Sequence, residues 1–199
     1  MKRSLVVLIV VFVVVLLGAN WGCGTYNGLV SMEEGVNSAW AQVQNVYQRR
    51  ADLVPNLVAT VQGAADFERG TLTDVINARA KATQVTIDSS VLNDPAKFSQ
   101  FQAAQGELGG ALSRLLVAVE KYPDLKANEN YLQLQSQLEG TENRIAVERR
   151  KFNEVAQGFN ARIRTVPTNF VANMAGLHHK EYFQADATAQ KAPEVKFGH

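Results

Sequence analysis

The sequence predicts an all-α membrane protein, in which an N-terminal transmembrane helix is followed by an antiparallel up-down-up-down four-helix bundle. Three observations lead to this fold class. An uncharged apolar run near the N-terminus is as long as a membrane span, and apolar residues farther along recur at intervals of three and four. No segment alternates polar and apolar residues over the length of a strand.

The apolar run extends from Leu5 to Leu17 and continues to Trp21, a residue type that favours membrane interfaces. Counted from Ser4 to Trp21 it contains about 18 residues, which is enough for a helix to cross a hydrocarbon core of roughly 30 Å. We therefore expect a transmembrane helix over residues 5–22, with membrane lipid as its partner.

The flanking charges predict the orientation of this helix. Lys2 and Arg3 precede the run, and no basic residue follows it closely. Because basic flanks are retained in the cytoplasm, we expect residues 1–4 there and the rest of the chain on the other side of the membrane.

Two alternatives to an uncleaved anchor stay open. A cleaved signal peptide needs small residues near its cleavage site, and Gly22 and Gly24 meet this need although the bulky Trp21 does not. The second alternative is lipidation of Cys23. Lipidated cysteines usually have a leucine three residues before them and a small residue two before them, and here these positions hold Asn20 and Trp21. The length and flanks of the run favour the anchor.

Composition narrows the class of partner. The chain has 20 basic and 19 acidic side chains, and this balance argues against nucleic acid as a partner. Its one cysteine cannot form an internal disulfide, so the fold must depend on packing.

Residues 26–166 show the spacing of packed helices. Apolar residues separated by three, four or seven place one apolar stripe along each helix. The stripes consist of Leu29, Val36 and Val43; Trp40, Tyr47, Val54 and Val61; Leu72, Val75, Ala82 and Val85; Phe98, Phe101, Gln105, Leu108, Leu112, Leu115, Val119 and Tyr122; and Tyr131, Leu138, Ile145, Phe152, Phe159 and Val166.

Prolines divide the helices. The predicted helices cover residues 26–50, 54–86, 95–122 and 126–165. Pro55 suits the first turn of a helix, so we expect a turn at residues 51–54; a helix running on through it would be about 90 Å long and would outrun every later helix. Asp94 is expected to cap the third helix, Pro123 lies in the next turn, and Pro167 ends the fourth helix.

Charged side chains lie on or beside these stripes. The candidates for an internal polar network are Arg50, Glu68, Arg79, Glu139, Glu142 and Arg149. Because an unpaired buried charge is strongly destabilising, we expect Arg50 or Arg79 to pair with one of the three carboxylates. The alternative is that the charged ends reach water while their stems cover the core.

No residue pattern predicts catalysis. We expect no catalytic residues, no cofactor and no metal site, and hence no enzyme. Adjacent side chains such as those of His178 and His179 diverge on a helix, and Cys23 has no basic neighbour to activate it. A hydrolase or metal-dependent enzyme using Glu68, Glu142 or His178 is the last-ranked hypothesis.

Several blocks of the sequence together form a distinctive pattern: Tyr26–Val30, Glu34, Trp40, Tyr47–Val58, Tyr122–Asn128, Leu138–Ala146, Phe152–Asn153, Asn160, Pro167 and Tyr182–Phe183. In these blocks the sequence resembles the LemA family of bacterial membrane proteins. The resemblance implies an anchor in the bacterial inner (cytoplasmic) membrane and an all-α bundle on the extracytoplasmic, periplasmic side. It implies no established enzymatic activity. Relatives include a magnetosome membrane protein, and members often occur with membrane zinc proteases, so a membrane protease or other membrane protein is a candidate partner.

The chain after the predicted bundle divides into a membrane-proximal segment, residues 167–183, and a flexible tail, residues 184–199. The candidate membrane-proximal contacts are Phe170, Met174, Leu177, Tyr182 and Phe183, with Lys180 reaching lipid headgroups. Alternatively the segment packs on the base of the bundle or on a neighbouring subunit. We favour packing, because polar residues interrupt the apolar pattern.

Two functions from different classes fit these features. The favoured one is a membrane-anchored, non-enzymatic scaffold or adaptor that acts through protein–protein contacts and self-associates as a homo-oligomer. The alternative is a membrane-shaping protein that acts on the bilayer through residues 167–183.

Overall fold

The computed structural model describes residues 2–63, 67–85 and 88–184, and within these ranges every regular element is a helix. The all-α prediction is confirmed. The elements are α1 (Lys2–Gln62), α2 (Arg69–Gln84), the 3₁₀ helix η1 (Ser89–Asn93), α3 (Pro95–Val119), α4 (Pro123–Lys126), α5 (Glu129–Arg164) and α6 (Thr168–Met174). The predicted tail lies outside the described residues except for Gln184.

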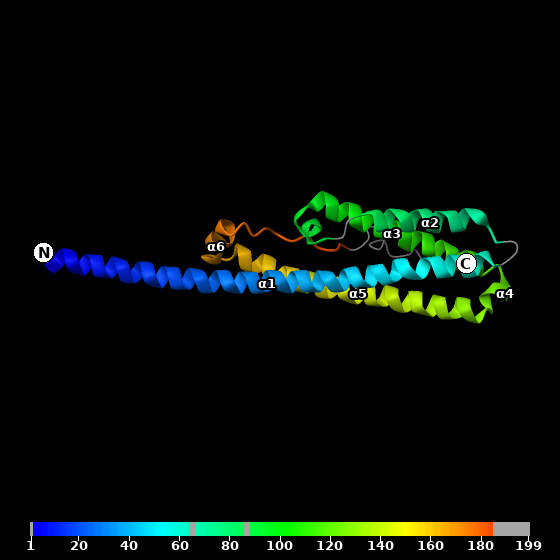
Figure 1. Ribbon diagram of the computed structural model, residues 1–199, viewed down its shortest axis with the longest axis horizontal. Coiled ribbons are helices and arrows are strands. Elements are labelled where there is room, and N and C mark those ends of the chain that lie inside the picture. The colour runs from blue at the N-terminus through cyan, green and yellow to red at the C-terminus, as the bar shows by residue number, and fades with distance from the viewer. Residues whose placement is uncertain (1, 64–66, 86–87, 185–199) are drawn as a thin grey trace, which may run out of the picture.

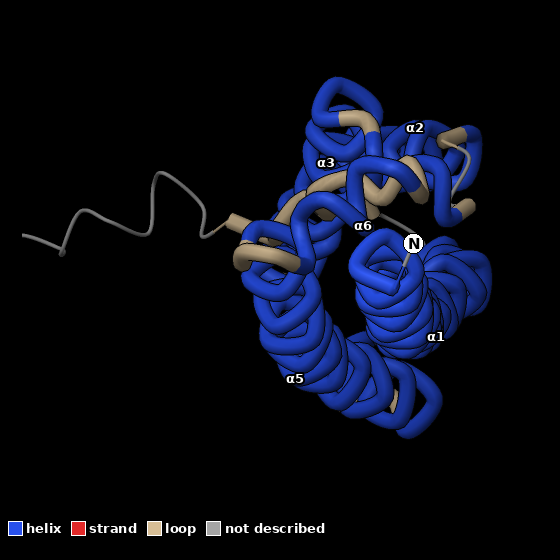
Figure 2. The backbone as a smooth tube through the Cα atoms, turned by 90° about the vertical axis from the view of Figure 1, so that its left-hand side faces the viewer, coloured by secondary structure: helices blue, strands red, loops and turns tan. Residues whose placement is uncertain are grey.

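The long helices lie as two pairs. α5 returns alongside α1, and α2 lies beside α3 (Figure 1). Seen along its length, the molecule shows the two pairs as separate layers (Figure 2). We call the part that begins at residue 26 the helical domain; among the described residues, the first part of α1 projects beyond it (Figure 1).

Two clusters of buried apolar side chains fill the domain. One joins the last turns of α1 to α2, the second half of α3 and the start of α5. The other joins the middle of α1 to the start of α3, the second half of α5 and Phe183. Nearly all of the predicted stripe residues are buried in these clusters. Val166 is an exception: it is exposed because α5 ends at Arg164.

α1 is one uninterrupted helix of 61 residues, so the predicted turn at residues 51–54 is wrong. The first helix ends at Gln62 and the second begins at Arg69. The length argument failed because α5, with 36 residues, is long enough to accompany α1 through the whole helical domain. Glu68 consequently lies outside the stripe of α1 and is exposed.

A side chain from α2 explains how α1 continues through Pro55. Proline has no N–H, so the carbonyl of Ala51, four residues earlier, loses its helical donor. The Nε of Arg79 donates to this carbonyl at 2.8 Å. Arg79 therefore supplies the hydrogen bond that Pro55 cannot.

Local capping sets the remaining bounds. Asp94 caps α3 as predicted, accepting from the N–H groups of Ala96 and Lys97. The predicted fourth helix instead begins at Glu129, where Asn128 accepts from Tyr131 N. The one-turn helix α4 and this asparagine cap together displace the start from residue 126.

The first part of α1 is long and apolar enough to cross a membrane, and its large side chains from Leu5 to Leu17 are exposed. Among the described helices it is the one that meets both criteria. This agrees with the membrane span predicted over residues 5–22.

A double-mutant cycle tests the role of Arg79. We expect Arg79→Met to destabilise the domain by about 1–3 kcal/mol, because the Ala51 carbonyl is left without a donor. In a Pro55→Ala background the helix supplies its own N–H, so the same change should cost much less. Urea unfolding in detergent micelles, followed by circular dichroism, measures both; an equal cost in the two backgrounds contradicts the assignment.

Candidate functional site

The segment after α6 crosses the helical domain in an extended conformation, and we call residues 177–184 the C-terminal strap. Two asparagines of α5 hold it. Asn160 exchanges two hydrogen bonds of 2.8 Å with the backbone of Lys180, and Asn153 exchanges two of 2.9 Å with the backbone of Phe183. Because each amide pairs with both an N–H and a carbonyl, the strap is held as a neighbouring strand would be.

Phe183 is a core residue. Its ring lies between 5.1 and 6.4 Å from the rings of Trp40, Phe98, Phe101 and Phe152. Phe183 therefore does not form the candidate contact with the membrane, and it packs on the domain, which is the interpretation that the sequence favoured. Its aromatic partners come from three helices that are distant in sequence, so the spacing of residues did not predict this cluster.

Lys180 is 3 % exposed, so its predicted contact with lipid headgroups is also wrong. Its Nζ donates to Glu33 at 2.7 Å and to Asn93 at 2.9 Å, and it lies 5.4 Å from the centre of the Phe159 ring. The ammonium thus joins the strap to α1 and to η1. The sequence did not predict the pair of Lys180 and Glu33, because these residues are 147 positions apart.

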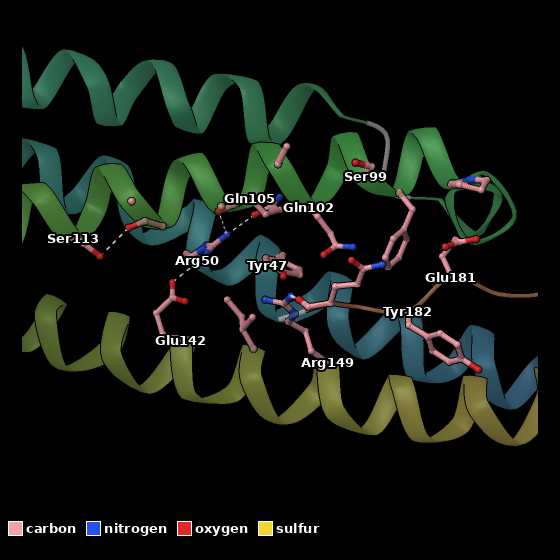
Figure 3. A pocket seen from close by; sticks show the side chains of 18 residues that line it. Tyr47, Arg50, Ser99, Gln102, Gln105, Ser113, Glu142, Arg149, Glu181 and Tyr182 are labelled. Carbon is pink, nitrogen blue, oxygen red and sulfur yellow. Dashed lines mark hydrogen bonds and ion pairs between the residues drawn. The ribbon is translucent and has the colours of Figure 1, made fainter. Parts of the chain in front are cut away.

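A cleft of about 860 Å³ opens between α3 and α5 beside the strap, and Arg50 lies at its inner end (Figure 3). Arg50 is 3 % exposed. It donates to Glu142 at 3.0 Å, to the backbone carbonyl of Gln105 at 3.0 Å and, through a short bond, to the Gln105 side chain. Its guanidinium also lies 5.0 Å from the centre of the Tyr47 ring.

The structure distributes the candidate polar residues over different contacts. Of the expected pairs it brings together Arg50 and Glu142. Arg79 bonds to Ala51, Glu139 accepts from Gln135, and Glu68 is exposed. Arg149 donates to the Gln184 carbonyl and stacks 4.6 Å from the Phe183 ring, so it belongs to the strap.

The remaining membrane-proximal candidates separate into two groups. Leu177 and Tyr182 are half-buried on the domain. Phe170 and Met174, on α6, are exposed. Only the second group offers a free apolar surface.

The cleft has a mixed polar and apolar lining. Arg50 is paired with Glu142, and the cleft is also lined by Arg149 and Glu181, by glycine, serine and glutamine residues, and by apolar side chains such as Phe98 and Ile145. Within the described ranges, no three His, Cys, Asp or Glu side chains gather as metal ligands. Its polar side chains offer hydrogen-bond donors and acceptors to whatever enters the cleft.

Two shifted titratable groups lie outside the cleft. Hydrogen bonds from the side chain and backbone of Ser90 lower the pKa of Asp88, where η1 begins. Burial raises the pKa of Tyr131, in the first turn of α5. Both shifts have local structural causes.

The contacts of Arg50 predict unequal effects of two substitutions. Arg50→Met leaves the buried side-chain oxygen of Gln105 without its donor and removes an additional donor from the Gln105 backbone carbonyl, and we expect a loss of about 1–3 kcal/mol in the free energy of unfolding. Glu142→Gln should cost less than about 1 kcal/mol, because the Glu142 side chain is 44 % exposed and an amide oxygen still accepts. Urea unfolding measures both; equal losses would mean that the ion pair dominates.

Lys180→Met tests the attachment of the strap. Without the ammonium, Glu33 and Asn93 lose their donor, and we expect the strap to open more often. Hydrogen exchange of the Lys180 and Phe183 N–H groups should then accelerate while exchange in the middle of α5 is unchanged. Lys151→Met, which removes only an exposed ion pair on α5, is the matched control. Unaltered exchange in the strap would show that Lys180 does not hold it.

Comparisons with known proteins agree with this architecture. The chain is 28% identical to magnetosome protein MamQ 2 of Paramagnetospirillum magneticum in an alignment of 175 positions that covers 80% of this chain and 64% of that protein. It is 29% identical to protein LemA of Metamycoplasma hominis, over 81% of this chain and 70% of that protein. The chain thus spans about two thirds of the length of these relatives. The LemA family model matches residues 39–197, which confirms the predicted resemblance: the chain belongs to the LemA family.

Proposed function

We propose that this protein is a single-pass membrane scaffold or adaptor, and that it is not an enzyme. In this proposal residues 1–4 lie in the cytoplasm, and α1–α3 and α5 form an antiparallel four-helix bundle on the extracytoplasmic side of the bacterial inner membrane. The bundle acts through contacts with other proteins, including copies of itself.

The observation that carries the proposal is the continuity of α1. A helix of 61 residues is about 90 Å long, so its apolar part and its packed part are one rod. No loop separates the membrane span from the helical domain. Such a connection transmits position and orientation from the bilayer to the domain, as a scaffold requires.

The surface and the relatives support contact with proteins. α5 carries exposed apolar side chains at Leu132, Val147 and Val155. Two of the relatives are named as magnetosome proteins. A membrane protease or another membrane protein is the candidate hetero-partner, and the balanced charge still argues against nucleic acid.

Membrane shaping is the second candidate function, and α6 favours it. With Phe183 and Lys180 taken into the domain, the part of residues 167–183 that could act on a bilayer reduces to the exposed side chains of α6. Liposomes that keep their shape when the protein is reconstituted would remove this candidate.

Cysteine crosslinking in spheroplasts tests the scaffold. In a Cys23→Ser background, Val147→Cys should react with a membrane-impermeant bis-maleimide and yield covalent dimers or complexes with other membrane proteins. Arg69→Cys, exposed at the start of α2, is the control for random collision.

Each outcome bears on a separate part of the proposal. Reaction of Val147→Cys only with a permeant reagent would reverse the orientation. Complete labelling with strictly monomeric product would contradict action through protein contacts.

A further inference from the structure

α6 presents an apolar surface that the helical domain does not cover. Its Thr168 and Ala172 are buried against the domain, whereas Phe170 is 63 % and Met174 is 91 % exposed. Val166, four residues before Phe170, is 75 % exposed. We call the exposed side chains of Val166, Phe170 and Met174 the α6 patch.

The continuity of α1 fixes the level of this patch relative to the apolar run. α6 contacts α1 and lies at the end of the domain nearest the N-terminus (Figure 1). Leu29 is the first buried residue of α1. Trp21 precedes it by eight residues, or about 12 Å along the helix, and a headgroup layer is itself about 6 Å thick. The patch therefore lies within reach of the layer where α1 leaves the hydrocarbon.

Two exposed aromatic residues of α1 mark the same level. Trp21 and Tyr26 are each 47 % exposed, and both follow the apolar run. Such residues favour the headgroup level of a bilayer. The aromatic residues of α1 and the apolar residues of α6 thus come from opposite ends of the chain and meet at one end of the molecule.

The charge of this end complements an anionic surface. The sequence contains no Asp or Glu between residues 4 and 32, or between residues 155 and 180. Arg162 and Arg164, in the last turn of α5, are exposed. The nearest carboxylate on α1, Glu33, is paired with Lys180.

We infer that the α6 patch docks on the surface of an anionic bilayer, with Phe170 and Met174 inserted at the boundary of headgroups and acyl chains and with Arg162 and Arg164 against acidic headgroups. Apolar side chains of interfacial helices enter a bilayer to about 5–10 Å, and each nearby basic residue adds attraction to acidic lipid. The inference rests on the proposed membrane anchoring of α1. Docking of the α6 patch gives the helical domain a second attachment to the membrane. This attachment limits the tilt of the domain relative to the bilayer, which a single transmembrane helix would not restrict.

Spin labels on the full-length protein test this contact. In a Cys23→Ser background, single cysteines replace Phe12, Met174 or Val117, and the labelled proteins are reconstituted in vesicles of phosphatidylcholine and phosphatidylglycerol. Phe12 reports insertion of α1, Met174 reports docking, and Val117, which is 69 % exposed on α3, is the water-exposed control. We expect the labels at positions 12 and 174 to be accessible to oxygen and shielded from a polar nickel complex, and the label at position 117 to show the reverse.

Two variants test the chemistry of the contact. Phe170→Ser should restore access of the nickel complex to the label at position 174. Arg162→Gln with Arg164→Gln should lower the ratio of docked to undocked protein about fivefold for each charge removed. Arg69→Gln with Lys121→Gln, two exposed cations from elsewhere in the domain, should leave the ratio unchanged.

The outcomes separate this inference from the anchoring on which it rests. A label at position 12 that stays in water overturns both. If position 12 is in lipid and position 174 remains as water-accessible as position 117, docking alone is overturned. If the shielding of position 174 disappears when the protein is diluted with more lipid, the α6 patch is covered by a second copy of the protein, and docking on the bilayer is again overturned. If the label at position 174 is shielded as well in vesicles of pure phosphatidylcholine as in vesicles that contain phosphatidylglycerol, the role of the two arginines is overturned.

Discussion

The structure depends on one helix remaining intact where its sequence would interrupt it. Pro55 removes a hydrogen bond from α1, and an unpartnered carbonyl at this half-buried position would favour a bend or a break. Arg79 of α2 donates to that carbonyl at 2.8 Å. The bond also ties α2 to α1, so the same contact preserves the rod and attaches its neighbour.

A second contact between distant parts of the sequence supports α1 near the apolar run. Lys180 of the C-terminal strap bonds to Glu33, which lies just after the apolar run of α1. Phe183 then enters the aromatic cluster around Trp40. The strap thus holds α1 against α5 close to the proposed membrane surface, where the rod would otherwise leave the domain with little support.

Periodic features could be predicted from the sequence, and isolated contacts could not. The stripes through Val43, Leu108 and Phe152 identified the buried faces, because burial on a helix repeats every three or four residues. The partnership of Arg50 with a carboxylate follows from the same spacing. Pro55 misled because the compensating donor is distant in sequence, and the asparagine contacts of the strap were missed because side-chain bonds to an extended backbone leave no repeat.

The polar contacts of Arg50 explain why long helices with heptad stripes adopt one alignment. Arg50, Gln105 and Thr141 are buried at one level, between the two apolar clusters. Moving α3 by one heptad would replace Gln105 with Leu112 or Phe98, and neither of these side chains can accept a hydrogen bond from Arg50.

The same test applied to α5 distinguishes the two directions. Moving α5 by one heptad in one direction would bring Arg149 to the place of Glu142 and put two guanidinium groups together, whereas Gln135, which arrives in the other direction, could still accept a hydrogen bond from Arg50. The first of these shifts leaves a buried charge without its carboxylate partner, a loss that the apolar stripes do not offset because they match almost as well in each register. The polar layer therefore selects the register, and the register in turn brings Asn153 and Asn160 to the strap and α6 to the membrane end.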